Sequence, residues 1–206
     1  MLFNTSKKWD FTPHVSLKTS LNTLEVVDSI KLLGIIISSD MKWHRNTNYL
    51  CEKAFGRLWI VRNLKKLGAS IPELIDIYIK QCRSIVELAV PVWTAGLTSE
   101  DIAALERVQK TACAIILGRK YRGYEDALKS LNLASLESRR EELCVKFAKK
   151  SAKNKKFEHW FVEAEKKGIL TRRKNVFNGY KPIKFRTERF RNSPLPYLTS
   201  LLNKNK

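Results

Sequence analysis

The chain has 206 residues and a mass of 23.9 kDa, which is long enough to bury a hydrophobic core without metal or disulfide staples. Hydrophobic residues make up 44% of it, which excludes a disordered tail. Lys and Arg number 39 against 20 Asp and Glu, a net charge of +19. A charge of this sign and size favours polyanionic partners, with nucleic acid ahead of an acidic membrane surface.

The chain contains no run of 18 apolar residues, and its first residues lack the apolar region of a signal peptide. We therefore expect an intracellular protein, cytoplasmic or nuclear and not secreted, with no membrane partner. In a reducing compartment its 4 cysteines should be thiols. Each of them lies among apolar residues at helical spacing, where Cys behaves as a small core residue.

Residues 1–40 have the pattern of strands. Residues 15–18 alternate apolar and polar side chains, and further strands are expected at 24–27 and 30–37. Gly34 predicts a bulge or a close backbone approach inside the last of these. Three strands with a single hairpin make a poor independent sheet, so a missing partner is expected beside it.

From about residue 40 the apolar residues recur at the spacing of an α-helix. Ser38, Ser39 and Asp40 are the expected caps of a first helix, which carries a buried stripe and stops near Gly68. The stripe consists of Leu50, Ala54, Leu58 and Val61.

The next helix is predicted by Ser70 and Glu73, which fit a capping box with Pro72 in the first turn. Its expected stripe is Ile71, Leu74, Tyr78, Cys82, Ile85, Ala89 and Trp93. Pro91 is expected to kink or end this helix.

Three more helices are predicted beyond it. The first starts with a capping box at residues 98–101 and runs to Gly118, the second spans about 124–131, and the third spans about 135–153. The region 41–165 is thus expected to be a helical bundle.

Residues 166–206 are predicted to form a basic, aromatic-rich C-terminal arm. Residues 151–206 carry 15 basic and 4 acidic side chains, so this last quarter holds more than half of the excess charge. Its Gly and Pro residues break any long element, although the apolar stretch 192–202 could dock on the body. The predicted fold class is mainly α with a small N-terminal β portion and a largely irregular C-terminal tail.

The sequence contains no catalytic constellation. It has no phosphate-binding glycine loop, no nucleophile elbow and no cluster with metal-ligand spacing. The acidic pairs fall at helix starts, where they complement the helix dipole, or on polar faces. His44 has no evident nucleophile partner and is interpreted as a surface residue. We therefore expect no catalytic and no metal-binding residues.

Nucleic-acid binding is the function class that remains. Cations ring the first long helix instead of forming one stripe, which favours backbone contacts over base recognition. In the arm, guanidinium and ammonium groups suit phosphates, and the aromatic rings suit bases. The expected nucleic-acid-binding residues are Lys53, Arg57, Arg62, Lys65, Lys66, Arg172, Arg173, Lys174, Lys184, Arg186, Arg189 and Arg191.

The order of the segments resembles the post-palm region of reverse transcriptases of non-LTR retrotransposons (long interspersed elements). The segment VVDSIKLLGIIISSDMKWHRNTNYLCEKAFGRLWIVRNLK is similar to that family's L-G strand, its D-x-x-W segment and its K-A-x-x-R-L helix. Four later segments are similar to the pieces that follow there: IPELIDIYIKQCRSIVELAVPVW, LERVQKTACAIILG, YEDALKSLNLASLESRREELCVKFAKK and RTERFRNSPLPYLTSLLN.

The resemblance implies a separate role for each part of the chain. Residues 1–40 would be the end of the palm with a primer grip at Leu33 and Gly34, and the helices after it would be a thumb that holds the template–primer duplex. The family's aromatic-Ala-Asp-Asp turn, whose carboxylates hold Mg²⁺, does not occur in this sequence. We therefore expect a nucleic-acid-binding fragment that is not an enzyme on its own. It should need no cofactor and no small-molecule substrate, and a palm domain is a further expected partner.

Two alternatives stay open. The chain could be one piece of a complete, active polymerase whose palm precedes Met1 in the gene. It could also be a helical protein–protein module whose charge serves solubility alone.

Overall fold

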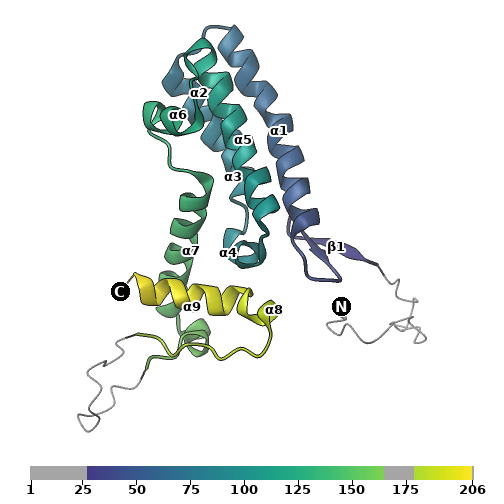
Figure 1. Cartoon of the computed structure of the whole chain (residues 1–206), viewed down its shortest axis with the longest axis vertical. Coiled ribbons are helices and arrows are strands. Elements are labelled where there is room, and N and C mark those ends of the chain that lie inside the picture. The colour runs from purple at the N-terminus through teal and green to yellow at the C-terminus, as the bar shows by residue number, and fades with distance from the viewer. Residues whose placement is uncertain (1–26, 165–178, 206) are drawn as a thin grey trace.

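The computed structural model describes residues 27–164 and 179–205. As predicted, the described chain is mainly helical and carries a small antiparallel sheet of two strands near its N-terminal end (Figure 1). The strands are β1 (Ser29–Leu32) and β2 (Ile35–Ser38). The longer helices are α1 (His44–Lys66), α2 (Ile71–Tyr78), α5 (Ser99–Leu117), α6 (Tyr124–Leu131), α7 (Leu136–Ala152) and α9 (Pro194–Lys204).

Short elements connect these helices. They are the π-helical turn η1 (Ile79–Arg83), the α-helical turns α3 (Ser84–Val86), α4 (Val90–Trp93) and α8 (Glu188–Arg191), and the 3₁₀ turns η2 (Thr94–Gly96), η3 (Gly118–Lys120) and η4 (Lys155–Trp160).

The predicted strand over 30–37 is wrong, because this segment folds back on itself as a hairpin. Ile30 pairs with Ile37 and Leu32 with Ile35, and the turn consists of Leu33 and Gly34. Both turn residues have positive φ, 48° and 85°, as a two-residue type I′ turn requires. Of the strands expected at 15–18 and 24–27, only Val27 lies inside the described residues, and it precedes β1.

The hairpin is anchored on the beginning of α1. The backbone N–H of Ile36 points away from β1 and donates to Asn46 Oδ1 at 3.0 Å. Arg45 donates to Ser29 Oγ at 3.1 Å from the same turn of the helix. A Cβ on Gly34 would lie 3.0 Å from Leu88 Cδ2, so the close approach predicted for this glycine is present.

Helix α1 starts later than predicted, at His44, after Trp43 as N-cap and not after Ser38, Ser39 or Asp40. Ser39 is held by the hairpin instead, since its N–H donates to Asp28 O at 2.7 Å. The predicted stripe is confirmed: Leu50, Ala54, Leu58 and Val61 are all buried, and this side of α1 packs on α5 (Figure 1).

The second helix contains an irregularity that the sequence does not reveal. The π turn η1 adds about one residue to the helical period, so the buried positions after Cys82 are Val86 and Val90. The predicted Ile85 and Ala89 are only half-buried. The helix ends at Val86, ahead of Pro91 as expected, and Pro91 lies in the separate turn α4, which follows Ala89 with its φ of 50°.

The two predicted capping boxes are confirmed. The Glu73 carboxylate accepts from Ser70 N at 2.8 Å and from Ser70 Oγ at 2.7 Å. The Asp101 carboxylate accepts from Thr98 N at 3.1 Å, while Thr98 Oγ1 accepts from Asp101 N at 3.2 Å. These boxes satisfy orphan N–H groups at the starts of α2 and α5.

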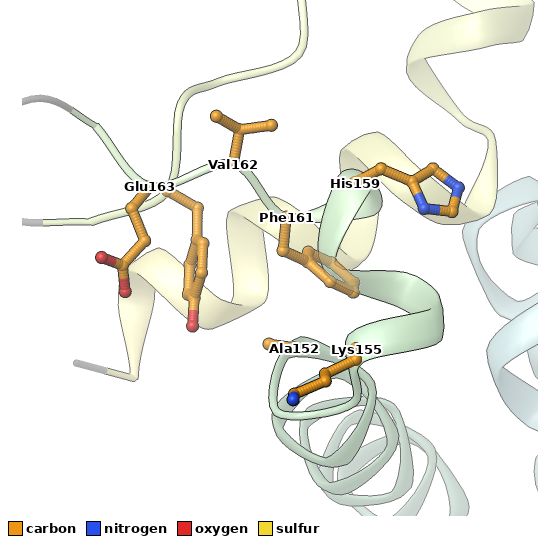
Figure 2. Close-up of a pocket in the computed structure, with 7 residues that line it drawn as sticks. Ala152, Lys155, His159, Phe161, Val162 and Glu163 are labelled. Carbon is orange, nitrogen blue, oxygen red and sulfur yellow. The ribbon is translucent and has the colours of Figure 1, made fainter.

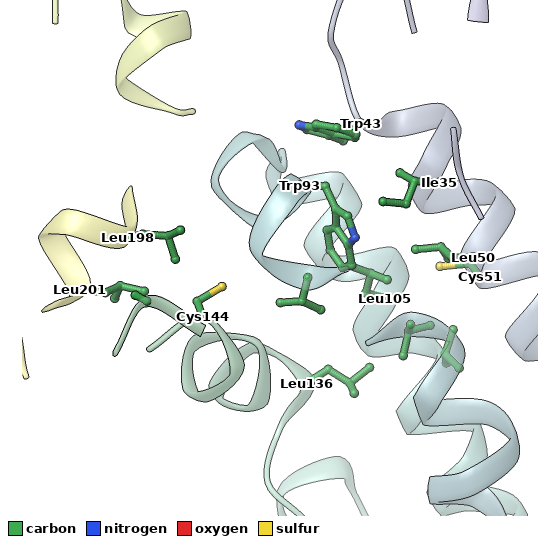
Figure 3. Packing of buried hydrophobic residues seen from close by; sticks show 14 of the residues in the cluster. Ile35, Trp43, Leu50, Cys51, Trp93, Leu105, Leu136, Cys144, Leu198 and Leu201 are labelled. Atoms are coloured by element: carbon green, nitrogen blue, oxygen red, sulfur yellow. The ribbon is translucent and has the colours of Figure 1, made fainter. Parts of the chain in front are cut away.

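The core forms two clusters of buried side chains. One joins α1, α2, α5 and α6 around Leu58 and Tyr78. The other joins α1, α4, α5, α7 and α9 around Trp93 and Leu105 (Figure 3). The second cluster includes Leu198, Leu201 and Leu202 of α9, so the expected docking of the C-terminal stretch is confirmed, and the last part of the predicted irregular tail is helical.

The four cysteines are free and buried, as predicted. Burial raises the pKa of each thiol to about 11, because the uncharged form is favoured away from water. Cys51 and Cys144 belong to one core cluster, and Cys82 and Cys113 belong to the other.

Candidate nucleic-acid interface

Four of the five cations predicted on α1 point into solvent. Lys53, Arg57, Arg62 and Lys66 are exposed. None of the four forms an ion pair within residues 27–164 and 179–205. Their charge is therefore available to a polyanion.

Lys65, the fifth, is used inside the protein. Its ammonium donates to the carbonyl oxygens of Ile115 and Ile116 in the last turn of α5, the second at 3.0 Å. A cation there satisfies orphan carbonyls and complements the helix dipole. A Cβ on Gly118 would lie 2.6 Å from Lys65 Nζ, so the glycine makes room for this contact.

Two lysines from different elements converge on one tyrosine ring. Lys31 Nζ of β1 lies 4.8 Å from the centroid of Tyr49, and Lys53 Nζ of α1 lies 5.0 Å from it. The proximity of Lys31, and then of Lys53, lowers the pKa of Tyr49, because an ammonium stabilises the phenolate. No carboxylate of the described residues pairs with either ammonium. We call Lys31, Tyr49 and Lys53 the lysine–tyrosine cluster.

Lys31 and Tyr49 were not among the residues expected from the sequence. The pair Tyr49 and Lys53, one helical turn apart, was a local signal for an aromatic–cation contact. Lys31 joins them only because the hairpin folds back onto α1, which follows from the turn at Leu33 and Gly34.

The residues that resemble a primer grip form the tip of the hairpin. Leu33 is 89% exposed at the first position of the turn. Gly34 is half-buried behind it, with the positive φ that the turn needs. The hairpin lies beside the first turns of α1, so this tip and the lysine–tyrosine cluster belong to the same corner of the molecule (Figure 1).

Of the C-terminal cations, Arg189 reaches the loop beside that corner. Arg189 donates to the backbone oxygen of Asp40, in the loop between β2 and α1. Arg191 lies 5.5 Å from the Phe185 ring and 3.4 Å from the Glu188 carboxylate. Lys184 and Arg186 are exposed. The predicted residues Arg172, Arg173 and Lys174 lie outside the described residues.

His44 is on the surface of α1, and its side chain links α1 to α5. Its Nδ1 lies 2.9 Å from the carboxylate of buried Asp101, and its Nε2 lies 3.1 Å from Asn48 Nδ2. The two contacts are compatible when Nδ1 donates to Asp101 and Nε2 accepts from Asn48. Both ring nitrogens are thus occupied, and the arrangement joins the start of α1 to the capping box of α5.

An open hollow of about 610 Å³ lies where the chain leaves α7 (Figure 2). Lys155, His159, Phe161, Glu163 and Tyr180 contribute to its walls. Its polar groups do not converge: among residues 27–164 and 179–205, no three His, Cys, Asp or Glu side chains are grouped as metal ligands would be. The charged corner of hairpin and α1 is therefore the better candidate site.

The chain matches no protein-family model, no curated protein and no solved structure. Within the described ranges, none of the helices combines the length and the hydropathy needed to cross a membrane.

Proposed function

We propose that this protein binds nucleic acid through the corner formed by the hairpin and α1, and that it acts by holding the nucleic acid rather than by chemistry of its own. The observation that carries the proposal is the lysine–tyrosine cluster. Two ammonium groups lie within 4.8 and 5.0 Å of one ring and have no carboxylate partner in the described chain. Like charges gathered in this way repel one another unless an anion joins them.

The resemblance to non-LTR reverse transcriptases supports the same role. In that comparison the hairpin tip at Leu33 and Gly34 corresponds to a primer grip, and α1 to a thumb helix on the template–primer backbone. We therefore propose a duplex with an RNA strand as the ligand to test first. The contacts are to phosphates, so binding should be mainly electrostatic.

The test is a titration of the whole protein with a fluorescently labelled RNA–DNA hybrid at several salt concentrations. If about six phosphates are neutralised, the slope of log K against log salt should be about −4 to −5. The variant K31Q/K53Q should flatten that slope by about 1 to 2. The matched control is K129Q/K146Q, which removes the same charge from α6 and α7, on the side of the bundle away from α1 (Figure 1). A salt-independent affinity, or equal effects of the two variants, would refute the proposal.

A second candidate function rests on the apolar side chains of the hairpin. Ile30, Leu32 and Leu33 are exposed together with Val27 just before them. Another protein, such as a palm domain, could cover these side chains with its own apolar surface and extend the sheet by pairing a strand with β1. This function predicts that hairpin substitutions abolish association with a protein while the affinity for nucleic acid stays unchanged.

A further inference from the structure

The outer face of α1 carries a large aromatic side chain that nothing in the described fold covers. Trp59 is 63% exposed, although this helix buries seven residues on its other side. A tryptophan usually buries most of its large ring system, so an exposed indole on a well-packed helix leaves a flat aromatic surface open to a ligand.

Gly56 lies one helical turn before Trp59, on the same face. No atom lies within 4 Å of a Cβ built on it, and its φ is not positive, so the fold does not require glycine here. Glycine inside a helix costs about 1 kcal/mol relative to alanine. A residue that costs stability and serves no contact within the chain suggests that a ligand approaches the backbone beside the indole.

The charge around the indole favours an anionic ligand. Arg62 and Lys66 follow Trp59 by about one and two turns, are exposed, and have no ion pair in the described chain. Glu52 is the acidic residue of this face and lies two turns before Trp59, beyond Gly56. The end of the face that Trp59 shares with the two cations is therefore positive.

We propose that Trp59, Gly56, Arg62 and Lys66 form a site for an unpaired nucleotide of single-stranded nucleic acid. The base stacks on the Trp59 indole, the sugar approaches the backbone at Gly56, and Arg62 and Lys66 contact the flanking phosphates. An unpaired nucleotide fits better than a duplex because paired bases already stack on each other and offer no free ring face. The two cations beside Trp59 and the net charge of +19 favour a nucleotide over a protein as the ligand. The inference rests on the proposed function and adds a ligand class and a site to it.

The test compares two single strands of equal length and charge, one with bases and one built of abasic nucleotides, titrated against the intact protein. The wild-type protein should prefer the strand with bases by about 5- to 150-fold, the range expected for one stacked base. W59A should bind both strands equally while its salt slope stays unchanged. L67A is the matched control, since it removes another exposed apolar side chain from the end of the same helix and should keep the preference.

Substitution of Gly56 gives an independent test, because a variant that is more stable but binds more weakly cannot be explained by misfolding. G56A should raise the melting temperature of the free protein, because it removes a helix-interior glycine without a clash, and should weaken binding of the strand with bases. G56L should weaken it further.

The outcomes separate the two proposals. If the wild-type protein binds both strands with equal affinity, the stacking site is refuted and electrostatic binding stands. If W59A keeps the preference, or G56A binds as tightly as wild type, the assignment of the site to α1 is overturned. If the protein binds neither strand nor the hybrid, the proposed function fails as well, and a protein partner becomes the better explanation for the exposed indole.

Discussion

At the residue scale, two adjacent lysines at the end of α1 have opposite roles. Lys65 satisfies carbonyls of α5, whereas the neighbouring Lys66 is exposed. Helix periodicity explains the contrast, since neighbours in sequence point about 100° apart around a helix. Charge alone therefore does not identify a ligand-binding residue, and its position relative to the buried stripe must be considered as well.

We predict that K65Q lowers the free energy of unfolding by about 1–2 kcal/mol, because two charge-assisted contacts are lost at a half-buried helix end. K66Q should change stability by less than about 0.5 kcal/mol and weaken nucleic-acid binding. Urea titrations of both variants measure the change in stability, and binding isotherms measure the change in affinity. The same loss of stability in both variants would contradict the assignment of Lys65.

The lysine–tyrosine cluster makes a prediction about pH. Cations near a phenol favour its charged form, so the pKa of Tyr49 lies below the ordinary tyrosine value. Replacing Lys31 and Lys53 by Gln should raise that pKa toward the ordinary value, and bound phosphates should raise it in the wild-type protein. An alkaline titration followed by NMR of labelled tyrosine, with Y49F for assignment, gives the answer. A Tyr49 pKa that does not move in either case would show that the ammonium groups are not held near the ring.

At the element scale, the hairpin turn needs positive φ at two positions, and only one of its two residues favours that conformation. Gly34 adopts its positive φ without strain, whereas Leu33, with φ 48°, occupies a position that favours Asn or Asp. A strained and exposed leucine at this tip is consistent with a contact made by its side chain.

L33N should therefore stabilise the protein, by about 0.5–1 kcal/mol, and reduce its light scattering at high concentration. G34A should destabilise it by about 1–2 kcal/mol, because alanine at positive φ is strained and its Cβ meets Leu88. Thermal unfolding of the two variants decides the point. If L33N also weakens binding of the hybrid, the tip contacts the ligand, and if L33N is less stable than wild type, the turn type is misassigned.

How much of the architecture the sequence could predict differs from element to element. The long helices follow from stripes such as Leu50 to Val61 and from the capping boxes at Ser70 and Thr98, which are local signals. The position of the hairpin turn was missed because leucine is a poor marker of a turn with positive φ. The shift from Ile85 to Val86 was missed because both positions are apolar, so the sequence fits a regular helix as well as one with a π turn.

The candidate site was less predictable than the fold. The sequence identifies exposed cations such as Lys53 and Arg62, because they fall outside the apolar stripe of α1. It does not reveal that Lys31 joins Lys53, or that Arg189 reaches Asp40, since both contacts depend on tertiary folding. Similarly, only the packing of α1 against α5 explains why Lys65 is unavailable to a ligand.

At the scale of the whole molecule, the C-terminal helix holds the basic segment in place. Leu198, Leu201 and Leu202 pack into the core cluster that also contains Trp93 and Leu105 (Figure 3). This packing sets the position of the preceding residues 184–191, and so brings Arg189 to the loop that precedes α1. The candidate interface thus combines the N-terminal hairpin, the first helix and the end of the chain.

We predict that L201A lowers the free energy of unfolding by about 2–4 kcal/mol, because it leaves a cavity in a shared core. Since α9 and α1 contribute to the same cluster, the variant should still unfold in one cooperative transition, with far-UV and near-UV signals changing together. S200A, on the exposed side of α9, is the control and should unfold like wild type. Early loss of α9 alone, ahead of the main transition, would mean that the C-terminal helix is only loosely attached.

The π turn η1, between α2 and α3, contains one residue more than the same stretch of regular α-helix would. Buried positions recur at Leu74, Tyr78, Cys82, Val86 and Val90, so eight residues separate Tyr78 from Val86, where two turns of regular α-helix would need about seven. Deletion of Gln81 would therefore leave an unbroken α-helix with its apolar side still facing the core. The same deletion in the regular helix α5 would rotate everything after it by about 100° and expose the core. In evolutionary terms, η1 is a position where we expect this fold to lose a residue without changing its packing.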